Sequence, residues 1–100
     1  MRRPQIRIEY LSGPEDGKIV GLTKDEVSIG RSEECDLVLS HDPTVSRRHA
    51  RLVREGEQVF IEDLRSTHGT LVNGEQVSER VALAPDALIR LGNSWLRFVG

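Results

Sequence analysis

The chain has 100 residues, of which 37% are hydrophobic and 30% are charged, with a formal net charge of −2. These values predict one folded domain with a modest core, spanning residues 1–100 with its ordered part at about 5–99. They exclude a nucleic-acid binder that relies on overall positive charge. No apolar stretch approaches the ~18 residues of a membrane span, so no membrane partner is expected.

The cysteine content and the N-terminal sequence bear on the cellular location of the protein. A single cysteine, Cys35, permits no intramolecular disulfide and no cysteine-based metal site. Residues 1–4 are not followed by an apolar segment, so no signal peptide is expected. Both features favour a cytoplasmic protein.

The first half of the chain contains short segments with strand patterns. Alternating apolar and polar residues or brief apolar runs predict strands at residues 5–10, 18–22, 26–29 and 36–39. A cluster of turn-forming residues at 12–17 separates the first two segments and predicts a hairpin with a long loop.

The second half continues in the same way, with strands predicted at residues 47–54, 59–61, 71–72, 87–91 and 95–99. The pair Asn73-Gly74 is a strong hairpin signal because both residues tolerate positive φ. Apolar residues nowhere recur with a helical period over three turns. Many short strands separated by turns predict an all-β sandwich, mostly antiparallel.

The chain holds residue types found in hydrolases and metal sites, but not their spacing. Asp63, His49 and Ser66 are the residue types of a hydrolytic triad, yet no Gly-x-Ser-x-Gly turn surrounds the serine. The three histidines, which include His41 and His68, are not spaced as metal ligands. We therefore expect no enzyme, no metal and no cofactor.

Polar residues gather in three loops at the ends of predicted strands. Arg31 follows a glycine at a strand end, where its forked guanidinium matches a phosphate dianion. Ser46 and Thr67 are short hydroxyl donors at loop–strand junctions, and Arg47 offers a second cation. Each residue has a plainer explanation, because loop hydroxyls often bond their own backbone and surface arginines often contact only water.

The order of these motifs resembles the forkhead-associated (FHA) domain family. The motifs are Gly30-Arg31, then SRRH at residues 46–49, then STHGT at 66–70 with Asn73-Gly74 after it. The family pattern is Gly-Arg, Ser-x-x-His and Ser-x-Asn-Gly-Thr. The resemblance covers nearly the whole chain and implies an FHA/SMAD-like β-sandwich of about eleven short strands. It also implies recognition of phosphothreonine in extended peptides.

The resemblance also implies a role for individual residues. Arg31 and Ser46 are expected to bind phosphate oxygens, Thr67 the phosphate or adjacent backbone, and Arg47 the phosphate or peptide. The residues expected to support the site from beneath are Gly30, His49 and Gly69. Residues 40–45 are expected to form the loop that inspects positions after the phosphothreonine, with His41, Asp42 and Thr44 as the selectivity residues.

One position departs from the family pattern. His68 occupies the place of the asparagine that usually bonds the main chain of the ligand. A neutral histidine donates one hydrogen bond but cannot act as an amide that donates and accepts at once. Because histidine changes charge near physiological pH, we expect the affinity for the ligand to depend on pH.

The sequence thus predicts a non-catalytic module that binds phosphothreonine-containing proteins in Ser/Thr-kinase signalling. Two alternatives keep the same fold. In the first, the domain is a scaffold or oligomerisation surface that does not depend on phosphate. In the second, it is an autoregulatory domain that binds a phosphorylated segment of its own parent chain. A third alternative is a hydrolase that uses Ser66.

Overall fold

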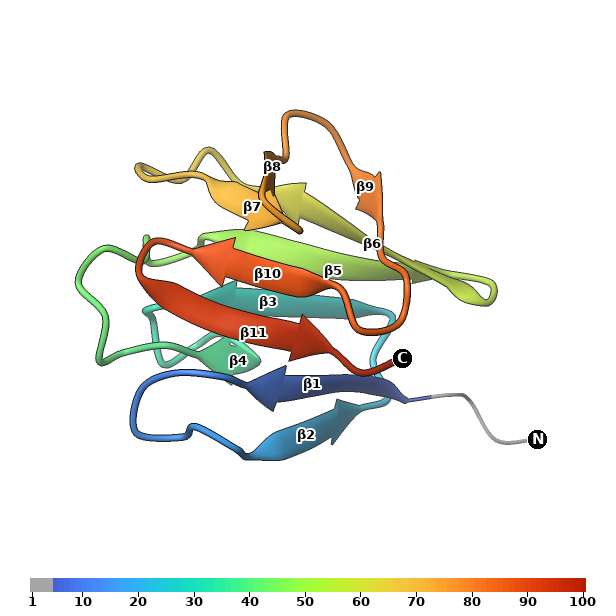
Figure 1. Ribbon diagram of the computed structural model, residues 1–100, viewed down its shortest axis with the longest axis horizontal. Helices are drawn as coiled ribbons and strands as arrows, with labels where there is room; N and C mark the ends of the chain where they lie inside the picture. The colour runs from blue at the N-terminus through green and yellow to red at the C-terminus, as the bar shows by residue number, and fades with distance from the viewer. Residues whose placement is uncertain (1–4) are drawn as a thin grey trace.

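The computed structural model describes residues 5–100, and these residues form two packed β-sheets without a helix (Figure 1). The N-terminal residues 1–4, which bear on the signal-peptide expectation, lie outside the described part. Within residues 5–100 there is no helix long and apolar enough to cross a membrane. The expected all-β sandwich is confirmed.

Six strands form the first sheet, in the order β2-β1-β11-β10-β7-β8, with every pairing antiparallel. The strands are β1 (Ile6–Tyr10), β2 (Ile19–Leu22), β7 (Thr70–Val72), β8 (Glu75–Gln76), β10 (Leu88–Leu91) and β11 (Ser94–Phe98). The last strand therefore lies between the first strand and the strands from the second half of the chain.

Five strands form the second sheet, in the order β4-β3-β5-β6-β9. They are β3 (Glu26–Gly30), β4 (Leu37–Val38), β5 (Ala50–Glu55), β6 (Gln58–Asp63) and β9 (Val81–Ala82). The pairing of β3 with β4 is parallel and the other pairings are antiparallel. The longest ladder joins β5 to β6 across the turn at Gly56, whose φ is 65°.

The core lies between the two sheets and is built from alternate strand residues. In β1, Ile6, Ile8 and Tyr10 face inward while the residues between them are more exposed. Leu52 from β5 and Ile89 from β10 are fully buried on the facing layers. Burying each such side chain contributes about 1.5–3 kcal/mol, so the period-two pattern accounts for how the sheets stack.

The predicted strands are found close to their expected positions, with one boundary error and two omissions. The strand expected at residues 47–54 begins at Ala50, because the preceding residues are tied to other loops. The two-residue strands β8 and β9 were not predicted, since so short a segment shows no alternation. The turn at Asn73-Gly74 is confirmed, with φ values of 50° and 86°.

Several loops meet at one end of the sandwich. In Figure 1 the loops after β3, before β5 and after β6 all lie at the left end, together with the β1–β2 loop and the β10–β11 turn. The three motif-bearing loops are therefore neighbours, although the sequence separates them by up to about forty residues.

Candidate functional site

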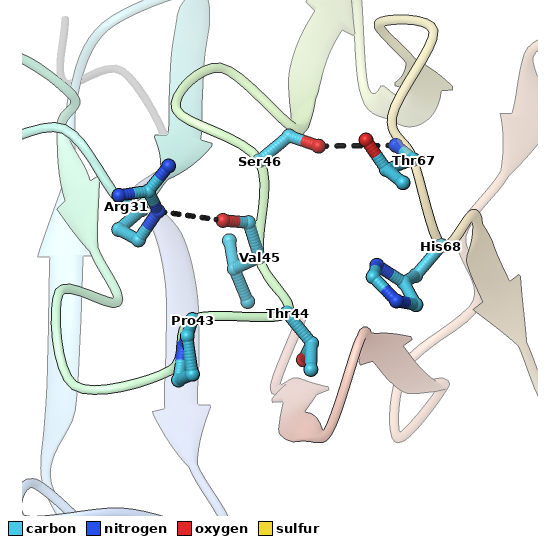
Figure 2. A pocket seen from close by; sticks show the side chains of 7 residues that line it. All are labelled: Arg31, Pro43, Thr44, Val45, Ser46, Thr67 and His68. Atoms are coloured by element: carbon cyan, nitrogen blue, oxygen red, sulfur yellow. Dashed lines mark hydrogen bonds between the residues drawn. The ribbon is translucent and has the colours of Figure 1, made fainter.

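A hollow of about 170 Å³ opens among the three motif-bearing loops (Figure 2). It is lined by Arg31, Pro43, Thr44, Val45, Ser46, Thr67 and His68. One residue comes from the end of β3, four from the loop before β5, and two from the loop between β6 and β7. The lining residues of this hollow include no carboxylate.

Arg31 is fixed at one wall of this hollow. Its backbone N–H donates to the Ser46 carbonyl at 3.0 Å, and its Nε donates to the Val45 carbonyl at 3.0 Å (Figure 2). Among residues 5–100, the two terminal nitrogens of the guanidinium have no hydrogen-bond partner. Gly30 permits this arrangement, because a Cβ there would lie 2.1 Å from the Arg47 carbonyl oxygen.

Two hydrogen bonds beyond the β5–β6 ladder join the loops that carry Ser46 and Thr67. Ala50 pairs with Asp63 at the end of the β5–β6 ladder, and the Leu64 N–H donates to the His49 carbonyl one step further out. At the hollow, the Thr67 N–H donates to Ser46 Oγ at 3.1 Å (Figure 2). Ser46 Oγ therefore accepts from the protein and keeps its own proton for a ligand.

His49 is fully buried beneath the hollow and joins its two loops. Its Nδ1 accepts from the Ser46 N–H at 3.0 Å, so Nδ1 carries no proton and Nε2 is the protonated nitrogen that donates to the Gly69 carbonyl at 2.9 Å. Both ring nitrogens are thus occupied by backbone groups. Ser66 consequently has no general base in His49, which argues against a hydrolytic triad.

Asp63 organises the loop that follows β6. Its carboxylate accepts from the Ser66 N–H at 3.1 Å, from Ser66 Oγ at 2.6 Å and from Thr70 Oγ1 at 2.7 Å. Ser66 Oγ also accepts from the Gly69 N–H at 2.9 Å. Burial of Asp63 opposes its ionisation, but the hydrogen bonds from Ser66 and Thr70 outweigh this effect and lower its pKa.

Asp42 plays a similar part in the loop before β5. This buried carboxylate accepts from the Thr44 N–H, from Thr44 Oγ1, from the Asn93 N–H and from Ser94 Oγ. Burial opposes the ionisation of Asp42, yet the hydrogen bonds from Ser94 and Thr44 lower its pKa below the usual value of 3.8. Asp42 therefore fastens this loop to the β10–β11 turn.

The arginines of the chain differ in their partners. On the outer face of the five-stranded sheet, Arg51 pairs with Glu26 and Glu62, and Arg80 pairs with Glu55 and Glu62. Among residues 5–100, Arg31, Arg47, Arg48 and Arg65 at the loop end form no ion pair with a carboxylate, and neither does Arg90, whose Nε donates to the Gly92 carbonyl in the β10–β11 turn. This end of the molecule is thus prepared for a negatively charged ligand.

The structure brings together some of the predicted site residues and separates others. Arg31, Ser46, Thr67, His68 and Thr44 line one hollow. The Arg47 side chain is exposed and outside that lining, while its carbonyl accepts from the Ser32 N–H at 3.2 Å. His41 lies against the β1–β2 loop, since a Cβ at Gly13 would meet its ring at 2.4 Å.

Two lining residues were not singled out from the sequence. Pro43 and Val45 add apolar surface to the hollow. They fall within the loop at residues 40–45, but an apolar residue in a loop carries no signal that distinguishes a ligand contact from packing. Within the described part of the chain, no group of His, Cys, Asp and Glu residues is arranged to hold a metal ion.

Comparison with known proteins agrees with this geometry. The sequence model of the FHA domain matches residues 27–92. The FHA domain-containing protein FhaB of Mycobacterium tuberculosis is 35% identical over 82 residues, which are 82% of this chain and 52% of FhaB. The chain thus spans about half the length of the curated relatives it matches.

Solved structures show the same fold. A structure from an analysis of phosphothreonine-dependent FHA domain interactions has a TM-score of 0.82 and 32% identity, and covers 93% of each chain. EmbR of Mycobacterium tuberculosis, in complex with a low-affinity phosphopeptide, has a TM-score of 0.86 and 29% identity over 97% of this chain and 24% of EmbR. The chain belongs to the FHA domain family.

Proposed function

We propose that this domain binds phosphothreonine-containing segments of partner proteins in Ser/Thr-kinase signalling, and that it is not an enzyme. The phosphate lies in the hollow between the three motif-bearing loops. The free terminal nitrogens of Arg31, the hydroxyl of Ser46 and the hydroxyl of Thr67 hold its oxygens. A phosphate adds a charge of about −1.5 to −2, so phosphorylation of the partner turns binding on.

The observation that carries this proposal is the state of Arg31. Its Nε is anchored to the Val45 carbonyl at 3.0 Å, its terminal nitrogens have no hydrogen-bond partner among residues 5–100, and the residue lines a hollow that contains hydroxyls and no carboxylate. Because this guanidinium is already ordered in the free protein, ligand binding costs less side-chain entropy. A scaffold that ignores phosphate has no need of such a donor set.

Preference for phosphothreonine over phosphoserine comes from the apolar part of the same lining. The exposed apolar residue of this lining is Pro43, to which we assign contact with the threonine methyl group, whereas Val45 borders the hollow but is buried in the core. One methyl group in such a contact gives about 10- to 200-fold discrimination. The same loop presents Thr44 to the ligand residues that follow the phosphothreonine.

The remaining predicted site residues have different roles in this proposal. His68 lines the hollow and holds the ligand main chain through a ring nitrogen. Arg47 is exposed beside the hollow and strengthens ligand attraction at longer range. Asp42 and His41 act on selectivity only through the shape of the loop, because Asp42 is buried and His41 lies against the β1–β2 loop.

The relatives support a regulatory setting. The glycogen accumulation regulator GarA of Mycolicibacterium smegmatis is 38% identical over 87 residues. The FHA domain of FhaA, solved in complex with the intracellular domain of Rv3910, has a TM-score of 0.81. We place this domain in the cytoplasm, where a Ser/Thr kinase marks its partner.

The test compares peptides that differ only in one residue: threonine, phosphoserine or phosphothreonine. Wild type is expected to bind the phosphothreonine peptide and to prefer it over phosphoserine. Arg31→Ala is expected to lose about 2–5 kcal/mol of this affinity, because the phosphate loses its main charged donor. Calorimetric titration measures the affinities. Arg51→Ala, on the outer face of the five-stranded sheet, is the matched control and retains binding.

Equal affinity of wild type for all three peptides would show that the domain does not recognise phosphate. It would favour the scaffold alternative. A phosphorylated segment of the parent chain that competes with the peptide would instead reveal autoregulation.

A further inference from the structure

The outer face of the six-stranded sheet carries exposed apolar side chains close to the loop end. Among residues 5–100, the large hydrophobic side chains that are exposed are Ile19, Leu88 and Trp95, and Trp95 is 38% exposed. Trp95 lies at the start of β11, just after the β10–β11 turn, and this turn is at the loop end in Figure 1. Tryptophan is enriched among the residues that contribute most to protein–protein binding.

Strand register places Trp95 in one row with Arg90 and Leu71. Arg90 pairs with Trp95 across the β10–β11 ladder and with Leu71 across the β10–β7 ladder. Neighbouring strands are about 4.8 Å apart, so the row covers about 10 Å of the outer face. The guanidinium carbon of Arg90 lies 5.5 Å from the centroid of the Trp95 ring, a cation–π contact. We call these three residues the sheet-face row.

Two arginines of β10 and β11 have different partners on this face. Arg97 pairs with Glu9 at 2.7 Å and with Asp86. Arg90 forms no ion pair among residues 5–100, and its Nε donates to the Gly92 carbonyl at 2.9 Å. The sheet-face row therefore combines an aromatic ring, an aliphatic side chain and a positive charge that the described fold does not neutralise. This composition suits a contact with an acidic and apolar segment.

The sheet-face row adjoins the hollow at the loop end. Leu71 is three residues after His68, which lines the hollow, so their Cα atoms are at most about 11 Å apart. On the other side of the row, the Asn93 N–H donates at 2.9 Å to Oγ1 of Thr44, which also lines the hollow. A ligand held in the hollow therefore has the row within reach of the residues that flank its phosphothreonine.

We propose that the sheet-face row is a docking site for a second segment of the phosphothreonine-bearing partner, one that carries a carboxylate between apolar side chains. This inference rests on the proposed function. A row of three side chains is far smaller than the roughly 20–30 residues that each partner contributes to a stable interface, so it does not hold a second copy of the domain by itself. A segment tethered through the phosphothreonine reaches the row at high effective concentration, so a few contacts suffice.

The test uses Trp95 as a reporter, because it is the only tryptophan of the chain. A phosphothreonine peptide is extended at either end by a six-residue Gly-Ser spacer, which spans about 13 Å, and then by Leu-Glu-Leu. Wild type is expected to bind one of these peptides about tenfold more tightly than a peptide with a Gly-Ser extension alone, with a shift in tryptophan emission. A Leu-Lys-Leu extension should give no gain, because its charge repels Arg90. Calorimetric titration measures the affinities.

Arg90→Gln and Trp95→Thr are the decisive variants, since both residues lie outside the lining of the hollow. Each is expected to lose most of the gain from the Leu-Glu-Leu extension, and to bind the unextended phosphothreonine peptide within about twofold of wild type. Ile19→Thr is the matched control, because Ile19 is an exposed apolar residue on β2 of the same sheet, outside the row. This variant should keep the full gain.

The docking site is overturned if neither extension improves binding to wild type, or if Arg90→Gln or Trp95→Thr retains the full gain. A concentration-dependent dimer of wild type in analytical ultracentrifugation, abolished by Trp95→Thr, would instead assign the row to a second copy of the domain. The unextended peptides test the proposed function separately. If the phosphothreonine form binds no better than the threonine form, the proposed function itself fails.

Discussion

The loop end and the outer face of the five-stranded sheet use arginine in opposite ways. On the sheet face, Arg51 donates to Glu62 at 2.8 Å and to Glu26 at 3.0 Å. At the loop end, within residues 5–100, the Arg31 guanidinium donates only to the Val45 carbonyl, and the residue lines a hollow without a carboxylate. The same residue type is thus neutralised by the fold in one region and left for a ligand in the other.

This difference shows how a chain with a net charge of −2 can bind an anion. Overall charge says little, because carboxylates on the sheet face cancel the arginines beside them. What matters is the local set of cations that the fold leaves without a carboxylate partner. Such a set attracts a ligand at short range and loses influence beyond about 8 Å at physiological salt.

The largest expected effect tests what holds the loop end together in place of ion pairs. His49→Ala removes the acceptor of the Ser46 N–H and the donor to the Gly69 carbonyl, and it leaves a cavity. We expect a loss of about 2–5 kcal/mol in the free energy of unfolding, measured by urea denaturation. Phosphopeptide affinity should fall with it, since both loops of the hollow lose their common support.

His41→Ala is the matched control for this substitution, because that histidine is exposed and outside the hollow. This variant is expected to change neither the free energy of unfolding nor the phosphopeptide affinity greatly. A stable His49→Ala domain with normal affinity would mean that the loops are held by their own turns.

A smaller effect is expected from the buried carboxylate beneath the loop before β5. Asp42 has a lowered pKa in the folded state, so its contribution to stability is present above the usual carboxyl pKa of 3.8 and is lost as the pH falls through the lowered value. Asp42→Asn should lower the free energy of unfolding by about 1–3 kcal/mol near neutral pH. The stability of this variant should then fall less steeply than that of wild type as the pH is lowered.

Thermal unfolding between neutral pH and strongly acidic pH measures this difference. Asp16→Asn, on the exposed β1–β2 loop, is the control and should follow the wild-type curve. Parallel curves for wild type and Asp42→Asn would contradict the role given to Asp42. The lowered pKa of Asp63 should leave part of the acid sensitivity in every variant.

The sequence predicts the framework of this fold well because alternation within strands reports which side chains are buried. The strand at residues 5–10 is found as β1, with Ile6, Ile8 and Tyr10 inside. The prediction of strands fails where backbone hydrogen bonds to distant loops override the local alternation of apolar and polar residues. The residues before Ala50 look like part of β5, yet His49 turns inward to bridge two loops.

The site was predictable in its motifs but not in its details. The motifs correctly indicate that Arg31, Ser46 and Thr67 converge, since loops at one end of a sandwich meet. Whether Asp42 contacts a ligand or supports a loop depends on burial, which the sequence of a polar loop does not show. The left-handed backbone of Arg65 is likewise invisible before the structure is known.

The paired course of the two loops beyond β5 and β6 restricts how the domain can change its length. Beyond the Ala50–Asp63 pair, the loops are joined by the bond from the Leu64 N–H to the His49 carbonyl and by the bond from the Thr67 N–H to Ser46 Oγ. Inserting one residue into either loop would disturb these two bonds and displace Ser46 or Thr67 from the lining of the hollow. The turn at Gly56, at the other end of the same two strands, carries no such restriction. Engineered insertions, such as a fluorescent reporter, therefore belong at Gly56 and not between Ser46 and Ala50.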